Sequence, residues 1–163
     1  MNDKEKIYAK LIEFCSYKPR SKKQIEDKIS LLFKRYGVYV DYAEKLRAEL
    51  LEMLSNDRLV DDSANVKAFV QSFISSSHPK SLRAIKSYLM GKGYSSVDIE
   101  NALEGVSSDF EIDAVKKLAE KKLLSMHNGN TRSGREKLIK YLMGKGYSYS
   151  LSRTAVDTIP DLK

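Results

Sequence analysis

Apolar residues recur along the chain at intervals of three or four positions, which is the period of a helix that buries one face. No run of four to eight residues alternates convincingly between apolar and polar side chains, as a half-buried strand does. The pattern therefore predicts an all-α protein. Nine apolar stripes support the prediction: Ile7, Leu11, Phe14 and Cys15; Ile25, Ile29 and Leu32; Ala43, Leu46, Leu50 and Leu54; Val66, Phe69, Val70, Phe73 and Ile74; Leu82, Ile85 and Leu89; Ile99, Ala102, Leu103 and Val106; Ile112, Val115, Ala119 and Leu123; Leu138 and Leu142; Leu151, Ala155 and Ile159.

A repeated motif groups these stripes. The eight residues from Tyr88 to Ser95 recur unchanged from Tyr141 to Ser148, at an offset of 53 positions (141 minus 88). The stretch from Ser81 to Gly93 has a fainter copy from Ser21 to Gly37; the ends of this copy are 16 positions apart, against 12 for Ser81 and Gly93. The difference is close to one helical turn, so the same face stays inward. Repeats of this length indicate stacked supersecondary units.

We therefore expect three tandem three-helix repeats, at residues 1–57, 58–107 and 108–163, that form an elongated, curved helical array. A unit of about 50 residues has little core of its own, so contact with its neighbours should stabilise it. The longest polar gap, 125–133, is the best candidate for a hinge between the second and third repeats.

Helix ends are marked by polar residues and by glycine. Three segments fit a capping box, in which two side chains bind exposed backbone amides reciprocally: Ser21 with Gln24, Ser108 with Glu111, and Ser133 with Glu136. Three glycines fit helix C-terminal positions that need a left-handed backbone: Gly37, Gly93 and Gly146.

The formal net charge is +7, and its excess lies in the last third: +2 for residues 1–57, +1 for 58–107 and +4 for 108–163. A basic face repeated in two units would follow phosphates or an acidic protein groove, although a merely solvated face is the alternative. The candidate binding residues are Lys80, Arg83, Lys86, Lys92, Lys116, Lys117, Lys121, Lys122, Arg132, Arg135, Lys137, Lys140 and Lys145.

Candidate catalytic and metal-binding residues are few. The adjacent Asp61 and Asp62 lack companion ligands, so we interpret them as a cap for the helix through Val66. His78 and His127 are isolated in polar linkers, without a nucleophile or carboxylate marked beside them. We therefore expect no catalysis, no cofactor and no metal.

Two tyrosines follow the repeated glycine turns. Tyr94 and Tyr147 could stack on bases or on a partner. An aromatic ring at this position more often closes the hydrophobic contact of a helix C-cap, and we favour that interpretation.

The composition bears on the compartment. The single cysteine, Cys15, cannot form an intrachain disulfide, and no apolar run reaches the roughly 18 residues of a membrane span. We expect a cytoplasmic protein that does not enter a membrane.

Three segments resemble the RecX family. Tyr17-Lys-Pro-Arg-Ser21 is similar to its R-x-R-S start of the second helix, and Arg58-Leu-Val-Asp-Asp62 with Ala64 and Phe69-Val70 is similar to its central signature. The stretch from Lys80 to Leu103 resembles a third motif, which the last third of the chain repeats. Departures at Gln71–Phe73 and Ser77–Lys80 concern the partner contacts more than the fold.

The resemblance implies a triple three-helix fold and regulation without bond chemistry. Proteins of this family bind the RecA recombinase and its filament on DNA, and they restrain filament growth, strand exchange and ATP hydrolysis in homologous recombination, DNA repair and the SOS response. It implies weak, sequence-independent binding to single- and double-stranded DNA. We expect a monomer whose basic face lies along the filament groove.

Two other functions stay open. The first is a helical adaptor for a protein partner other than RecA. The second is a helix-turn-helix DNA reader, although the helix expected from Val97 to Val106 carries Asp98, Glu100 and Glu104 where polar base-reading residues would be needed.

Overall fold

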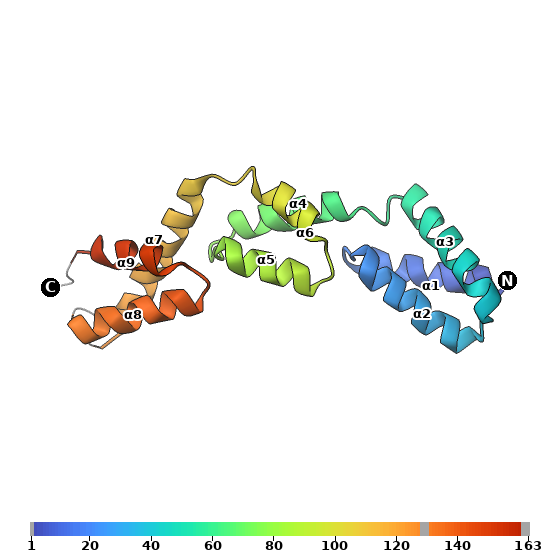
Figure 1. Cartoon of the computed structure of the whole chain (residues 1–163), viewed down its shortest axis with the longest axis horizontal. Helices are drawn as coiled ribbons and strands as arrows, with labels where there is room; N and C mark the ends of the chain where they lie inside the picture. The colour runs from blue at the N-terminus through green and yellow to red at the C-terminus, as the bar shows by residue number, and fades with distance from the viewer. Residues whose placement is uncertain (1, 128–130, 161–163) are drawn as a thin grey trace. The chain divides into compact units, whose positions relative to one another are not determined.

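The computed structural model describes residues 2–127 and 131–160, apart from the side chain of Ser108, and this part of the chain is helical without a strand. Figure 1 shows the helices in chain order. Their bounds are α1 (Asp3–Tyr17), α2 (Lys22–Tyr36), α3 (Val40–Asn56), α4 (Asp62–Ile74), α5 (Leu82–Gly91), α6 (Ser96–Leu103), α7 (Ser108–Leu124), α8 (Arg132–Gly144) and α9 (Tyr149–Asp157). The all-α prediction is confirmed. The repeat boundaries and the elongated, curved arrangement stay predictions.

The chain forms two compact units, which we call unit 1 (Met1–Ala68 with Leu89–Glu100) and unit 2 (Phe69–Tyr88 with Asn101–Lys163). In unit 1, helices α1, α2 and α3 share one core. The largest fully buried side chains of this core all belong to the apolar stripes predicted from the helical period: Ile7, Leu11, Ile25, Ile29, Leu46, Leu50 and Leu54. Burial of each such side chain contributes roughly 1.5–3 kcal/mol, so this core is the main stabilising element of α1–α3.

In unit 2, helices α7, α8 and α9 share a second core that includes Val115, Leu138 and Leu142. The prediction that Ile112 belongs to this core is wrong, because its side chain is 38% exposed. The inward face of α7 is centred on Ala114 and Val115, and Ile112 falls at its border.

One of the three expected capping boxes is confirmed. Ser21 accepts from the Gln24 amide, and the Gln24 side chain accepts in return from the Ser21 amide. The other two are wrong, because each helix begins earlier than expected. Ser107 caps α7, and Thr131 caps α8 by accepting from the Gly134 amide.

The expected left-handed glycines are confirmed, with φ of 64° at Gly37, 85° at Gly93 and 96° at Gly146. The prediction that segment 125–133 is a hinge between the second and third repeats is wrong. The segment after α7 leads into α8, and both helices pack in the core of unit 2. It therefore lies within one three-helix group; residues 128–130 lie outside the described part.

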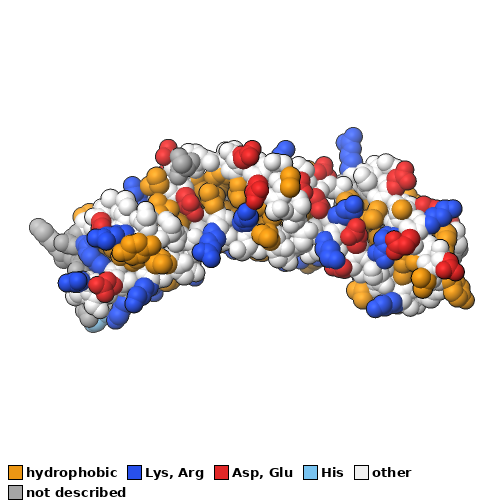
Figure 2. All heavy atoms as spheres, viewed as in Figure 1, with side chains coloured by type: hydrophobic (Ala, Val, Ile, Leu, Met, Phe, Trp, Pro, Cys, Tyr) orange, Lys and Arg blue, Asp and Glu red, His pale blue; other side chains and the backbone are white. Residues whose placement is uncertain are grey.

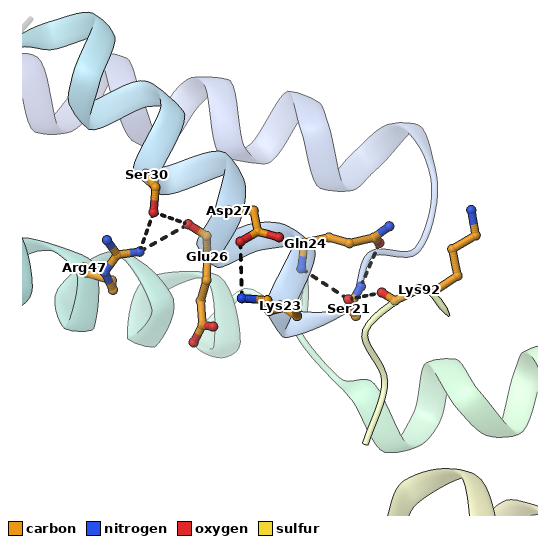
Figure 3. Close-up of polar contacts among 8 residues, drawn as sticks. All are labelled: Ser21, Lys23, Gln24, Glu26, Asp27, Ser30, Arg47 and Lys92. Atoms are coloured by element: carbon orange, nitrogen blue, oxygen red, sulfur yellow. Dashed lines mark hydrogen bonds and ion pairs between the residues drawn. The ribbon is translucent and has the colours of Figure 1, made fainter. Parts of the chain in front are cut away.

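A recurring hydrogen bond joins elements far apart in sequence. Within unit 1, the Ser21 hydroxyl donates to the Lys92 carbonyl at 2.6 Å, as Figure 3 shows. Within unit 2, the Ser81 hydroxyl donates to the Lys145 carbonyl at 2.8 Å. Ser21 and Ser81 are both fully buried, and Lys92 and Lys145 occupy matching places in the repeated motif. The sequence repeat is thus also a repeat of contacts.

The adjacent backbone amides repeat the pattern. Lys22 donates its amide to Asp62 at 2.9 Å, and Leu82 donates its amide to Glu111 at 3.1 Å. In each case a carboxylate from a later helix binds a free amide in the first turn of an earlier one, where the helix dipole favours negative charge.

Candidate functional site

A pocket of about 410 Å³ lies within unit 2, between the segment that precedes α5 and the helices α7 and α8. It is lined by Ser77, His78, Pro79, Lys80, Ser81, Ala84, Ala114, Lys117, Leu118, Lys121, Tyr141, Gly144, Lys145 and Tyr147. The volume is in the usual range for a small ligand or a projecting group of a larger one.

Four of the lysines that the sequence nominated line this pocket: Lys80, Lys117, Lys121 and Lys145. They come from three separate stretches of the chain, and the described lining residues include no carboxylate. A concave surface with one sign of charge focuses its field and raises the local concentration of the opposite ion. The pocket is therefore suited to an anionic group.

Aromatic rings position two of these lysines. The Lys80 ammonium lies 5.2 Å from the ring centre of Phe73 and 5.4 Å from that of Tyr88. Lys145 lies 5.3 Å from the ring centre of Tyr141. Attraction between a cation and a ring is worth about 0.5–1 kcal/mol at exposed sites, which limits the lysine rotamers without neutralising their charge.

His78 is not isolated, contrary to expectation. Its Nε2 lies 2.6 Å from the Lys121 ammonium, and its Nδ1 lies 3.0 Å from the Ser77 hydroxyl. Because an ammonium only donates, Nε2 accepts in this contact. The two contacts hold the ring between the Lys121 ammonium and the Ser77 hydroxyl.

The other nominated basic residues lie elsewhere. Lys92 belongs to unit 1, whereas the remaining eight belong to unit 2 outside the pocket lining: Arg83, Lys86, Lys116, Lys122, Arg132, Arg135, Lys137 and Lys140. Arg132 lies 3.6 Å from Glu136. Figure 2 shows Lys and Arg side chains interspersed with Asp and Glu on the visible face. The four lysines of the pocket therefore differ from the other nominated basic residues in lining a common cavity.

The two repeated tyrosines are buried, with 5% of Tyr94 and 3% of Tyr147 exposed. This confirms the interpretation as capping contacts and excludes stacking on a base in this conformation. Burial, with a smaller effect from the charge of Glu111, raises the pKa of Tyr147 to about 12.

Of the acidic pair, Asp61 is the expected cap of α4. Asp61 accepts from the Ala64 amide at 2.8 Å at the start of α4. Asp62 instead binds the Lys22 amide, a role that sequence reasoning missed because the two residues are 40 positions apart. Burial raises the pKa of Asp62, although the Lys22 amide opposes this effect. Across the described residues, no three His, Cys, Asp or Glu side chains gather as a metal site.

Sequence reasoning also missed a basic groove of about 690 Å³ in unit 1, where the charge of the surrounding segment is nearly balanced. Its lining residues are Lys10, Glu13, Phe14, Ser16, Tyr17, Arg20, Lys28 and Arg35. Only the fold shows that residues from α1, α2 and their connection meet there.

No helix in the described part of the chain is long and apolar enough to span a membrane.

Residues 109–156 match the family model described as RecX, third three-helix domain. Over 161 residues, the chain is 28% identical to the regulatory protein RecX of Limosilactobacillus reuteri, covering 97% of this chain and 58% of that protein. The corresponding protein of Oceanobacillus iheyensis is 31% identical over 142 residues, which cover 87% of this chain and 49% of that protein. The chain thus spans less than two thirds of these relatives.

Two crystal structures share the fold. RecX from Lactobacillus salivarius is 25% identical, with a TM-score of 0.74 and coverage of 95% of both chains. A second structure, of a regulatory protein RecX, is 26% identical, with a TM-score of 0.75 over 95% of this chain and 72% of that one. The two curated relatives and the second structure are named regulatory proteins, in agreement with the prediction of a regulator. With its helical triplets, repeated glycine turns and matching third domain, the chain belongs to the RecX family.

Proposed function

We propose that the chain is a non-catalytic regulator that binds the RecA recombinase filament and restrains strand exchange and the coupled ATP hydrolysis. Family membership supports a regulatory role, and RecA is the partner that the motif resemblance implies. We further propose weak, sequence-independent binding to single- and double-stranded DNA, in the cytoplasm, by a monomer.

The observation that carries the binding proposal is the pocket with Lys80, Lys117, Lys121 and Lys145 on its walls and no carboxylate among its described lining residues. A RecA filament on DNA presents phosphates at regular spacing. Contacts with phosphates release counterions and need no base sequence. The pocket is therefore proposed to hold a phosphate of the filament DNA.

Three tandem repeats, at residues 1–57, 58–107 and 108–163, would make several weak contacts along the filament. Once one contact has formed, the others become intramolecular and gain effective concentration. A regulator that binds one filament state more tightly than another shifts the population toward it. Restraint then needs only a preference for a filament state that does not progress.

The test measures ATP hydrolysis by RecA on single-stranded DNA with substoichiometric amounts of the chain. Hydrolysis should slow with the wild type. The variant Lys117→Glu with Lys121→Glu should lose most of this effect, because it reverses two charges in the pocket. The matched control, Lys137→Glu with Lys140→Glu, changes the same charge outside the pocket lining and should retain it.

Circular dichroism should show equal helicity in both variants. An unchanged hydrolysis rate with equimolar wild type would contradict the regulatory proposal, and equal loss in the two variants would contradict the role of the pocket. A salt titration separates the open alternatives. Direct DNA binding weakens steeply with salt, whereas an adaptor for another protein would show no DNA binding to titrate.

A further inference from the structure

We propose that the groove of unit 1 is a binding site for single-stranded nucleic acid, with Tyr17 as the stacking surface and the surrounding cations as phosphate contacts. Its working residues are Lys10, Phe14, Tyr17, Arg20, Lys28 and Arg35. The inference rests on the proposed DNA binding and deepens it, because it assigns unit 1 a ligand contact of its own.

The exposed aromatic ring is the first observation. Tyr17 is 83% exposed, at the C-terminal end of α1, on the wall of the groove. What distinguishes Tyr17 from other exposed aromatic residues such as Tyr39 is its place on the wall of a groove lined by cations. A base of any identity can stack on such an aromatic ring, because every base has a π-face.

The cations form the second observation, and one of them is held in place. The Arg20 guanidinium carbon lies 3.9 Å above the centre of the Phe14 ring, and Arg20 Nε donates to the Phe14 carbonyl at 3.3 Å. Lys28 lies 5.4 Å from the same ring centre. A planar guanidinium fixed by a ring beneath it is preorganised to bind a phosphate or a base.

The charge balance of the groove is positive. Four lining residues are cationic and one, Glu13, is acidic. Glu13 pairs with Lys10 at 3.0 Å, which leaves Arg20, Lys28 and Arg35 as the other cations of the lining. The hydrogen bond from Lys10, with the charges of Lys10 and Lys28, lowers the pKa of Glu13.

The combination favours nucleic acid over an acidic peptide. A peptide carboxylate would use the cations but would leave the Tyr17 ring exposed. A single strand supplies phosphates and unpaired bases together, so it matches both features at once. A duplex hides its bases in the stack and would use the cations alone.

The experiment measures binding of a fluorescein-labelled oligothymidylate of about 15 nucleotides, a length that spans one compact site. Tyr17→Ala should weaken binding about tenfold, the effect of losing roughly 1.4 kcal/mol of stacking, and Tyr17→Phe should restore it. The matched control is Tyr39→Ala, which removes a tyrosine that is 84% exposed outside the groove lining and should have no effect.

A second pair tests the charges. Lys28→Gln should weaken binding about threefold and lower its salt dependence, while Lys34→Gln, on the same helix but outside the groove lining, should not. Wild-type affinity in both Tyr17→Ala and Lys28→Gln, or equal loss in Tyr39→Ala, would overturn the inference. So would failure of the wild type to bind the oligonucleotide.

Binding to RecA without DNA is measured in parallel on the same proteins. RecA binding without oligonucleotide binding would overturn the groove and the proposed DNA binding, and would leave the proposed regulation of RecA standing. Groove-dependent oligonucleotide binding without RecA binding would support the groove and overturn the proposed regulation of RecA. If the groove variants lost RecA binding but kept the oligonucleotide, the groove would be a protein contact, and the inference would be wrong.

Discussion

The hydroxyl of Ser81 donates a hydrogen bond to the backbone carbonyl of Lys145, 64 residues further along the chain. Ser81 Oγ also accepts from the Ala84 amide at 3.2 Å, so one buried hydroxyl caps α5 and binds the turn after α8. Ser21 does the same for α2 and Lys92. A helix cap thereby serves as a long-range contact at two matching places.

Replacing Ser81 by alanine should therefore cost more than the loss of an ordinary cap. Removal of a serine cap costs about 1 kcal/mol. The Lys145 carbonyl would also lose its donor, which adds roughly 1 kcal/mol. We expect Ser81→Ala to lower the free energy of unfolding, measured by urea titration, by about 2 kcal/mol. The control Ser148→Ala removes the exposed cap of α9 alone and should cost about half as much. Equal losses would contradict the double role of Ser81.

Gly146→Ala should be strongly destabilising for two separable reasons. Its φ of 96° disfavours any side chain, and an added Cβ would lie 2.5 Å from Ser81 Oγ. Gly37→Ala carries the first penalty alone, because it has a φ of 64° and open space around it. We expect roughly 1–2 kcal/mol for Gly37→Ala and at least 1 kcal/mol more for Gly146→Ala.

Gly144→Ala is the matched control for this pair. Gly144 lies in α8 with open space around its Cβ position, so alanine should stabilise the helix by up to about 1 kcal/mol. Thermal unfolding followed by circular dichroism ranks the three variants. The same stability for Gly37→Ala and Gly146→Ala would show that the close approach to Ser81 has no energetic weight.

The Tyr147 hydroxyl should make the protein sensitive to alkali. Burial first, then the charge of Glu111, raises the pKa of Tyr147 from 10.0 to about 12. The unfolded chain thus loses this proton first, so the free energy of unfolding falls as the pH rises from 10 through 12. Below that window the contribution is fully present.

Tyr147→Phe should flatten this alkaline slope, measured by urea unfolding at several pH values. The hydroxyl is buried without a hydrogen-bond partner among the described residues, so its removal should not destabilise the protein at neutral pH. Tyr8, whose pKa burial and the Asp57 hydrogen bond also raise to about 12, should keep part of the slope. A slope unchanged in Tyr147→Phe would contradict the assignment.

Arg135 should prove structural and not a partner contact. Its guanidinium donates to the Val156 carbonyl at 3.0 Å, near the C-terminal end of α9. Arg135→Gln should lower the free energy of unfolding by about 1 kcal/mol, because this carbonyl loses a charged donor. Lys137→Gln, on the same helix, should have almost no effect. Weaker filament binding by Arg135→Gln at unchanged stability would contradict this view.

Much of the architecture could be predicted from the sequence because it depends on local rules. The spacing of Ile7 and Leu11, or of Leu138 and Leu142, follows the helical period and identifies buried faces. Gly93 and Gly146 adopt the left-handed backbone that ends a helix. The predicted capping boxes at α7 and α8 were wrong because Ser107 and Thr131, whose side chains also cap helices, come one and two positions earlier in the chain.

By itself, the sequence determined the helices, the repeat and the surplus of basic residues, since each follows from neighbours along the chain. Only the tertiary structure decided which of these lysines share a pocket, that His78 meets Lys121, and that Phe14 and Arg20 form a groove with residues of α2. Such groupings depend on how helices that are tens of residues apart pack together. The position of a basic residue in the sequence does not show which other side chains it will contact in the fold.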